Sequence, residues 1–174
     1  MFKTTTSGVE TQNDKELISI DKFRTINNKE ICYRIFDFRY IDYDLKRVKR
    51  HRFPVMNNMF KENIGLSFNR QIEVKRSFFD VFVTTLMFDK HALSMKENNY
   101  FAPLYIYPES DNQQTSTETL KRTPNLDPTL LDEITQGLGL NFTAEKQDDA
   151  NSFAPIDLLD YIYAVLHSPN YRDT

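Results

Sequence analysis

The stretch that organises this chain is YRIFDFRYIDYDLKRVKRHR, which runs from Tyr33 to Arg52. Its first half is aromatic and alternating, as a β-strand with one buried face is. Its second half places five cations and no acid within seven residues: Lys46, Arg47, Lys49, Arg50 and Arg52. Lysine and arginine neutralise phosphates, and arginine does so with a planar fork of donors. The pattern therefore predicts DNA-backbone contacts on a strand-like support, with a solvated basic loop as the alternative.

Length and composition indicate one globular domain with room for appendages. The chain has 174 residues, 40% of them hydrophobic, and holds 14 Phe and 9 Tyr. A chain of this size can bury a hydrophobic core. It has no apolar run long enough to cross a bilayer and no signal peptide, and its one cysteine, Cys32, excludes an internal disulfide. We therefore expect a cytoplasmic protein with no membrane partner.

Charge is distributed unevenly along the sequence. Residues 1–107 carry 18 Lys and Arg against 13 Asp and Glu, a net of +5, and residues 108–174 carry 4 against 12, a net of −8. Together these values give the overall charge of −3. Only the first part is therefore expected to face an anionic partner.

The order of predicted elements indicates the fold class. Alternating or β-branched segments predict strands over residues 30–36, 40–43, 64–68, 78–85 and 101–107. We expect Asp37 and Arg39 at the turn between the first two strands, and the last strand near a sheet edge because prolines bound it. A short amphipathic helix is expected over 55–60. Strands precede helices, which predicts an α+β fold: a mixed, mostly antiparallel sheet with short helices, then a small helical C-terminal part.

Two helices are expected in the C-terminal part. Asp127 can cap the first, with Pro128 at its first position and Gly137 or Gly139 at its end. The second begins at Pro155, and Ser168 and Pro169 end it. We further expect the chain to be truncated at its C-terminus, because it stops soon after an apolar helix face.

Asn69, Arg70 and Gln71 are the candidates for reading DNA bases. Arginine pairs with guanine, and asparagine or glutamine with adenine, through two hydrogen bonds in the major groove. These residues follow the strand predicted over 64–68, which would hold them at its end. The alternatives are an ordinary polar turn, or a buried Arg70 paired with Asp80 or Asp89. Weaker candidates for DNA contact are Lys75, Arg76, Lys90 and His91.

Two other chemistries were weighed against DNA binding. Glu73 and Lys75 resemble half of a metal-dependent nuclease site, which also needs an upstream Asp to bind Mg²⁺; a solvated turn is the alternative. The three histidines lie far apart without a Cys pair, so we expect no metal site and no cofactor in this chain. A third hypothesis is a protein-interaction module whose basic patch meets an acidic partner.

Several stretches carry a resemblance to one family. They are YRIFDFRY (33–40), NIGLSFNRQ (63–71), VFVT (81–84), YFAPLYIYP (100–108) and DYIYAVLHSP (160–169). In this order they resemble the C-terminal specificity region of single-polypeptide restriction–modification enzymes, the type ISP and the related type IIG and IIL groups. Ile35 stands where that pattern often has Pro, a departure that affects the strand.

The resemblance implies a non-catalytic fragment that recognises a DNA sequence. Its partners would be double-stranded DNA and the methyltransferase domain of the same polypeptide. S-adenosylmethionine and Mg²⁺ are implied for the parent enzyme, an adenine methyltransferase joined to an endonuclease. The expected parts are a flexible segment (1–16), a strand-rich target-recognition core (17–108), a polar linker (109–123) and an acidic helical part (124–174).

Overall fold

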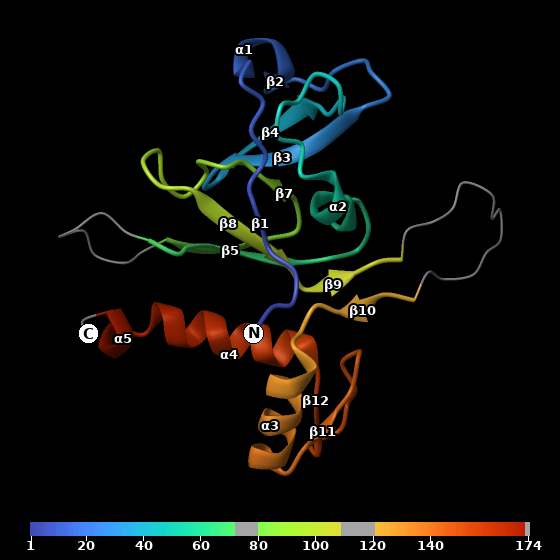
Figure 1. Ribbon diagram of the computed structural model, residues 1–174, viewed down its shortest axis with the longest axis vertical. Helices are drawn as coiled ribbons and strands as arrows, with labels where there is room; N and C mark the ends of the chain where they lie inside the picture. Colours follow the sequence, from blue (N-terminus) through green and yellow to red (C-terminus); the bar gives the residue numbers. More distant parts are fainter. Residues whose placement is uncertain (72–79, 109–120, 173–174) are drawn as a thin grey trace.

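The chain folds into three layers in the computed structural model, which describes residues 1–71, 80–108 and 121–172. Two four-stranded sheets face each other, and a long helix covers the outer face of one of them (Figure 1). Most strand pairs are antiparallel, and the described helices lie largely at the C-terminal end. The predicted α+β class, with short helices and a small helical C-terminal part, is therefore confirmed.

The first sheet lies in the middle layer and has the strand order β1-β8-β5-β6. Its strands are β1 (Thr6–Ser7), β8 (Asn99–Pro103), β5 (Gly65–Asn69) and β6 (Val81–Thr84). Position 65 in this sheet requires a glycine, because a Cβ on Gly65 would lie 2.2 Å from the Phe101 ring. The predicted strand over 101–107 is wrong in two respects. Leu104 divides it into β8 and β9 (Tyr105–Ile106), and β8 is an interior strand.

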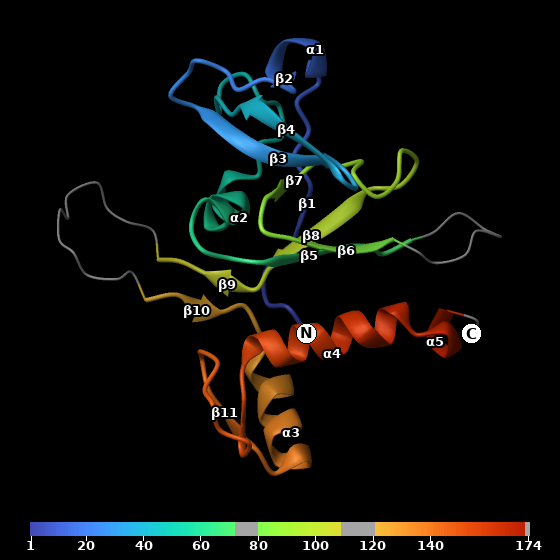
Figure 2. The ribbon, with the colours of Figure 1, turned by 180° about the vertical axis from the view of Figure 1, so that it is seen from behind.

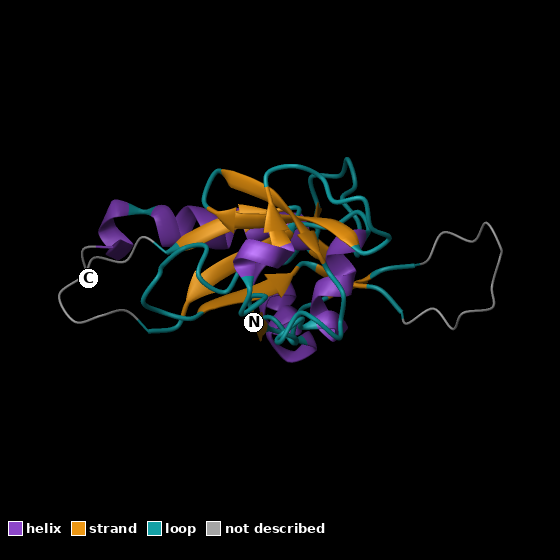
Figure 3. Ribbon diagram, turned by 90° about the horizontal axis from the view of Figure 1, so that it is seen from above, coloured by secondary structure: helices purple, strands orange, loops and turns teal. Residues whose placement is uncertain are grey.

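The second sheet has the order β2-β4-β3-β7 and lies above the first in the view of Figure 1; Figure 3 looks down on the molecule from that side. Its strands are β2 (Ile18–Ser19), β4 (Asp37–Asp42), β3 (Asn28–Arg34) and β7 (Met87–Phe88). The turn between β3 and β4 is Ile35–Phe36, where Phe36 takes a φ of 62°. The expectation that Asp37 and Arg39 form this turn is wrong, since both belong to β4.

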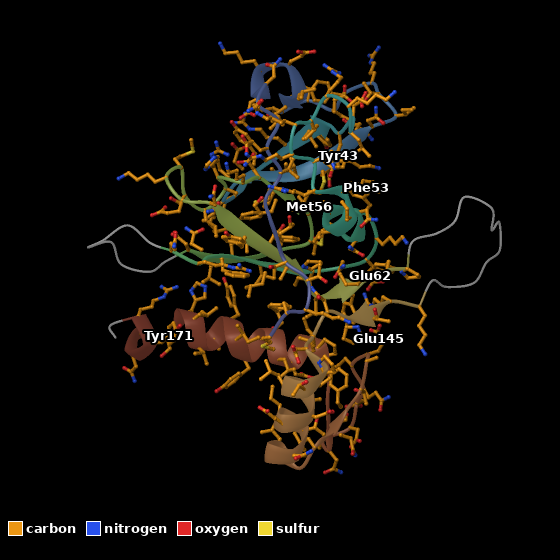
Figure 4. All side chains as sticks on the ribbon, in the orientation of Figure 1. Tyr43, Phe53, Met56, Glu62, Glu145 and Tyr171 are labelled. Atoms are coloured by element: carbon orange, nitrogen blue, oxygen red, sulfur yellow. The ribbon has the colours of Figure 1, made fainter. Side chains whose placement is uncertain are left out.

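The main core lies between the two sheets. Ile31 and Ile41 from the second sheet meet Phe101 from the first, and Phe88 stacks on Phe101 at 5.9 Å between ring centroids. One end of this core is closed by α2 (Phe53–Met56) and the 3₁₀ helix η1 (Asn57–Phe60), which confirms the helix predicted over 55–60. Met56, labelled in Figure 4, is completely buried.

The C-terminal helices build the third layer and a satellite unit. Helix α4 (Pro155–His167) lies under the first sheet and packs Leu159 against Leu66 and Val81 (Figure 2). Helix α3 (Pro128–Leu138) begins at Asp127, whose carboxylate accepts from the Thr129 and Leu130 amides, and ends at Gly139, as predicted. The remaining elements are α5 (Pro169–Arg172), β10 (Thr123–Pro124), β11 (Asn141–Phe142) and β12 (Ser152–Phe153).

The N-terminal residues are built into the fold rather than lying beside it. β1 pairs with β8, Val9 is completely buried, and α1 (Asp14–Leu17) follows. These N-terminal elements therefore belong to the fold, and the predicted division of the chain into parts stays a prediction. None of the helices among the described residues is long and apolar enough to cross a membrane.

Candidate nucleic-acid interface

The basic run forms a tight turn around one buried side chain. The Arg47 and Val48 amides both donate to the Asp44 carbonyl, at 3.0 and 2.9 Å. Val48 is buried and anchors the turn, while Lys46 and Lys49 are exposed on it. Neither lysine has an ion-pair partner among the described residues, so both are available to an anionic ligand.

Arg47 and Arg50 are already engaged with carboxylates. Arg47 pairs with Asp42 at 2.6 Å and also with Glu16. Arg50 Nη1 lies 3.2 Å from Glu10 Oε2, and the backbones of these two residues are also paired. The predicted five-cation cluster is thus divided into neutralised and free members.

Arg52 is the last cation of the basic run and the N-cap residue of α2. It has a φ of 55°, in the left-handed region that non-glycine residues seldom adopt. Its carbonyl accepts from the Met56 amide at 2.9 Å. Its Nε is buried and has no hydrogen-bond partner among the described residues. A buried unsatisfied donor is uncommon and calls for a ligand or a water.

The predicted base readers at the end of β5 differ in solvent exposure. Arg70 and Gln71 are exposed, whereas Asn69 is only 6% exposed. The side-chain amide of Asn69 donates through Nδ2 to Asp80 Oδ2 at 2.6 Å. Its Oδ1 accepts from Asn99 Nδ2, also at 2.6 Å. Asn69 therefore joins the strand ends in a buried polar network.

Arg70 is held by two contacts at the surface. Its guanidinium lies 4.2 Å from the centre of the Tyr100 ring, and its Nη2 donates to Thr5 Oγ1 at 2.9 Å. It has no carboxylate partner among the described residues, so the alternative of an Arg70 pair with Asp80 or Asp89 is wrong. Stacking orients the guanidinium and leaves its other donors available.

These side chains meet in one hollow of about 370 Å³, which we call the basic hollow. Four of its lining residues are cationic: Arg50, Arg52, Arg70 and Lys90. The others are Thr5, Thr6, Ser7, Asn98 and Tyr100. The fold thus combines the basic run with a predicted base reader and a weaker candidate, although 18 or more residues separate them in sequence.

The weaker candidates are Lys90, which lines the basic hollow, His91, and residues outside the described ranges. Lys90 Nζ donates to Glu10 Oε2 at 3.0 Å, and this hydrogen bond lowers the pKa of Glu10. The His91 amide donates to Asp89, whose pKa is raised by burial although Arg34 opposes this. Lys75, Arg76 and the Glu73/Lys75 pair lie outside the described residues. Within the described ranges no group of three His, Cys, Asp or Glu side chains could hold a metal ion.

Thr5, Ser7 and Glu10 were not predicted from the sequence. They lie in a polar N-terminal run with no period, which offered no signal of strand structure. Ser7 Oγ is buried with no partner among the described residues, as is Arg52 Nε. Both residues line the basic hollow, and neither of these two atoms has a hydrogen-bond partner among the described residues.

Comparison with known proteins places this fold in a family. The sequence model described as the Type ISP C-terminal specificity domain matches residues 2–174. No match is found among the curated proteins compared. The solved structures include a cryo-EM structure of a DrdV–DNA complex, with a TM-score of 0.72 and 16% identity over 99% of this chain and 20% of that one.

Two further solved structures are similar. One is the ATP-dependent Type ISP restriction–modification enzyme LlaBIII bound to DNA, with a TM-score of 0.72 and 12% identity over 99% of this chain and 13% of that one. The other is a nuclease-deletion mutant of the Type ISP enzyme LlaGI with a DNA substrate mimic, with a TM-score of 0.65 and 14% identity over 99% and 19%. The chain thus spans a fifth or less of these solved chains, and it belongs to the Type ISP C-terminal specificity domain family.

Proposed function

We propose that this chain is the DNA target-recognition domain of a longer restriction–modification polypeptide and is non-catalytic by itself. Its family and its fold, shared with three proteins solved with DNA or a DNA mimic, support this. Methylation and cleavage, with their S-adenosylmethionine and Mg²⁺, would belong to other parts of that polypeptide. Its partners are double-stranded DNA and the methyltransferase domain.

The observation that carries the proposal is the basic hollow. Three separate segments deliver Arg52, Arg70 and Lys90 to it, although the chain as a whole has a charge of −3. Cations concentrated on one face of an acidic chain attract a polyanion locally. The neighbouring Lys46 and Lys49, free of described ion pairs, extend this cationic surface.

The residues expected to contact DNA have two roles. Lys46, Lys49 and Arg52 bind phosphates, which are the same on any sequence. Arg70 and Gln71 read bases, because a guanidinium stacked on Tyr100 is oriented before DNA arrives. Asn69 anchors them through its buried hydrogen bonds rather than reading a base itself.

A binding measurement on the chain alone tests the proposal. Fluorescence anisotropy with a labelled duplex should give a dissociation constant of about 10⁻⁴–10⁻⁶ M at physiological salt, weakening steeply as salt rises. Binding is expected to be weak because a recognition domain shares its duplex with the methyltransferase. Absence of salt-dependent binding at any concentration tested would overturn the proposal.

Base reading is tested in the full-length enzyme. Arg70→Ala and Gln71→Ala should relax recognition at one or two positions of the methylated site, since a bidentate contact discriminates by about 1–3 kcal/mol. Lys49→Ala is the matched control and should leave the methylated sequence unchanged. If mapping shows the same site in all three variants, the base readers lie elsewhere.

A further inference from the structure

Glu10 supplies a negative charge at the edge of the basic hollow. Its Oε2 lies 3.0 Å from Lys90 Nζ and 3.2 Å from Arg50 Nη1. A single carboxylate thus holds two of the four cations that line the hollow. The Glu10 side chain is 22% exposed, so solvent ions and ligands can reach the group.

The backbone fixes Glu10 in this position. The Glu10 amide donates to the Arg50 carbonyl at 3.2 Å, and the Arg50 amide donates back at 3.0 Å. The Lys90 amide donates to the carbonyl of Val9, at 2.8 Å. Gly8 allows this close approach, since a Cβ there would lie 2.5 Å from the Asp89 backbone. The carboxylate and its two cations are therefore held together by the fold rather than by chance side-chain encounter.

The other two cations of the basic hollow lack such a partner. Arg52 and Arg70 have no carboxylate within ion-pair distance among the described residues. Arg52 Nε and Ser7 Oγ are buried and unpaired there. Two cations of the hollow, Arg50 and Lys90, are thus neutralised by Glu10, whereas Arg52 and Arg70 are not neutralised by any described carboxylate.

We propose that Arg52 and Ser7 form a site for one DNA phosphodiester beside the base-reading Arg70, and that Glu10 is a built-in competitor that weakens DNA binding. A carboxylate and a phosphate oxygen accept from the same donors, so Glu10 withholds Arg50 and Lys90 from the duplex. The inference rests on the proposed function for the identity of the phosphate. Because this competition acts on every sequence alike, it lowers the affinity for all duplexes by the same factor and leaves the discrimination between sequences to base reading.

Charge removal at two matched positions tests the inference. Glu10→Gln removes the competitor, and Glu16→Gln is the control with the same change in net charge. Arg47, the partner of Glu16, keeps its 2.6 Å contact with Asp42 in the control. With the full chain and a random-sequence duplex, Glu10→Gln should bind about three- to tenfold more tightly, and Glu16→Gln within about twofold of the parent. Urea unfolding of both variants verifies the fold.

An NMR titration with inorganic phosphate separates the inference from the proposed function. The signals of Ser7, Arg52 and Arg70 should move on adding phosphate, and at lower concentration in Glu10→Gln. If duplex binds but the two variants agree in both titrations, Glu10 is no competitor and the proposed function stands. If phosphate moves these signals as expected while no variant binds duplex, the hollow is an anion site and DNA recognition fails. If phosphate moves none of them, the site itself is overturned.

Discussion

Arg70 and Arg122 are among the arginines of this domain that lie on tyrosine rings, and the two differ in their other contacts. Arg70 lies 4.2 Å from the Tyr100 ring centre and Arg122 lies 3.9 Å from that of Tyr105. Arg122 donates through Nε and Nη2 to the Glu145 carboxylate, at 2.7 and 2.6 Å, and through Nη1 to the Glu62 carbonyl at 2.9 Å. Arg70 makes one described hydrogen bond, to the Thr5 hydroxyl.

The difference indicates that Arg122 stabilises the fold, whereas Arg70 is available at the surface. All three nitrogens of Arg122 are used, and they tie the strand-rich part to the helical part near Glu62 and Glu145 (Figure 4). Arg70 is oriented by the same stacking but retains free donors toward the basic hollow. Stacking on a tyrosine therefore does not show whether an arginine stabilises the fold or is available to a ligand. The presence or absence of a carboxylate partner distinguishes the two.

The largest effect should come from emptying the basic hollow. Replacing Arg52 and Arg70 together by Ala removes one guanidinium contact to phosphate and one to a base, and should weaken duplex binding about tenfold to a hundredfold at low salt. The free energy of unfolding should change by less than about 1 kcal/mol, because neither side chain has a described carboxylate partner. Anisotropy and urea unfolding measure the two quantities. Unchanged affinity in a folded double variant would place the DNA elsewhere.

Arg122→Ala should give the reverse result. It removes a bidentate carboxylate contact and a bond to a backbone carbonyl, and should lower the free energy of unfolding by about 1–2 kcal/mol. Duplex affinity should remain within about twofold of the parent. Arg122→Lys keeps the charge but loses the fork, so an intermediate stability is expected. A strong loss of DNA binding in Arg122→Ala at full stability would erase the contrast with Arg70.

The sequence predicted the elements better than the fates of neighbouring side chains. Capping chemistry is local, so Asp127 and Gly139 could be assigned to the ends of α3 from sequence alone. The alternation of apolar residues in β5 was also visible in the sequence, but it does not reveal that both faces of the strand are covered by other elements. Because α4 packs on one face and the second sheet on the other, Asn69 is buried beside an exposed Arg70.

Pairing between distant residues could not be predicted for a physical reason. Glu10 and Lys90 are 80 positions apart, and only the sheet arrangement brings them to 3.0 Å. A run of cations therefore reveals that positive charge is present but not how much of it the fold neutralises. Lys49 and Arg47 looked equivalent in the sequence, yet Arg47 alone meets described carboxylates.

That contrast within the basic run predicts a moderate effect. Lys49→Ala should weaken binding to all duplexes alike, about two- to fivefold, and flatten the slope of log affinity against log salt by roughly one unit. Arg47→Ala should leave the slope nearly unchanged, because its charge is already matched by Asp42 and Glu16. Salt titrations with two unrelated duplexes compare the variants. An effect of Lys49→Ala on one sequence but not the other contradicts a phosphate role.

The smallest effect concerns the acid stability of the Arg122 joint. Hydrogen bonding to Arg122 lowers the pKa of Glu145 in the folded chain. A carboxyl with a lowered folded pKa stabilises the fold above its unfolded pKa of about 4.3, and this contribution is lost as pH falls through the folded pKa. Stability of the parent should therefore decline below about pH 5 more steeply than that of Glu145→Gln, which has no proton to bind.

The Glu145 side chain is 54% exposed, so water screens this pair and the difference between the two pH profiles should be small. Asp148→Asn serves as the control, since Asp148 is exposed and has no ion-pair partner among the described residues. Urea midpoints taken between pH 3 and pH 7 should show parallel profiles for the control and the parent, and a flatter one for Glu145→Gln. Parallel profiles for all three would mean that the Tyr105 ring and the Glu62 carbonyl hold Arg122 without the carboxylate. The Glu145 carboxylate would then not be what distinguishes Arg122 from Arg70.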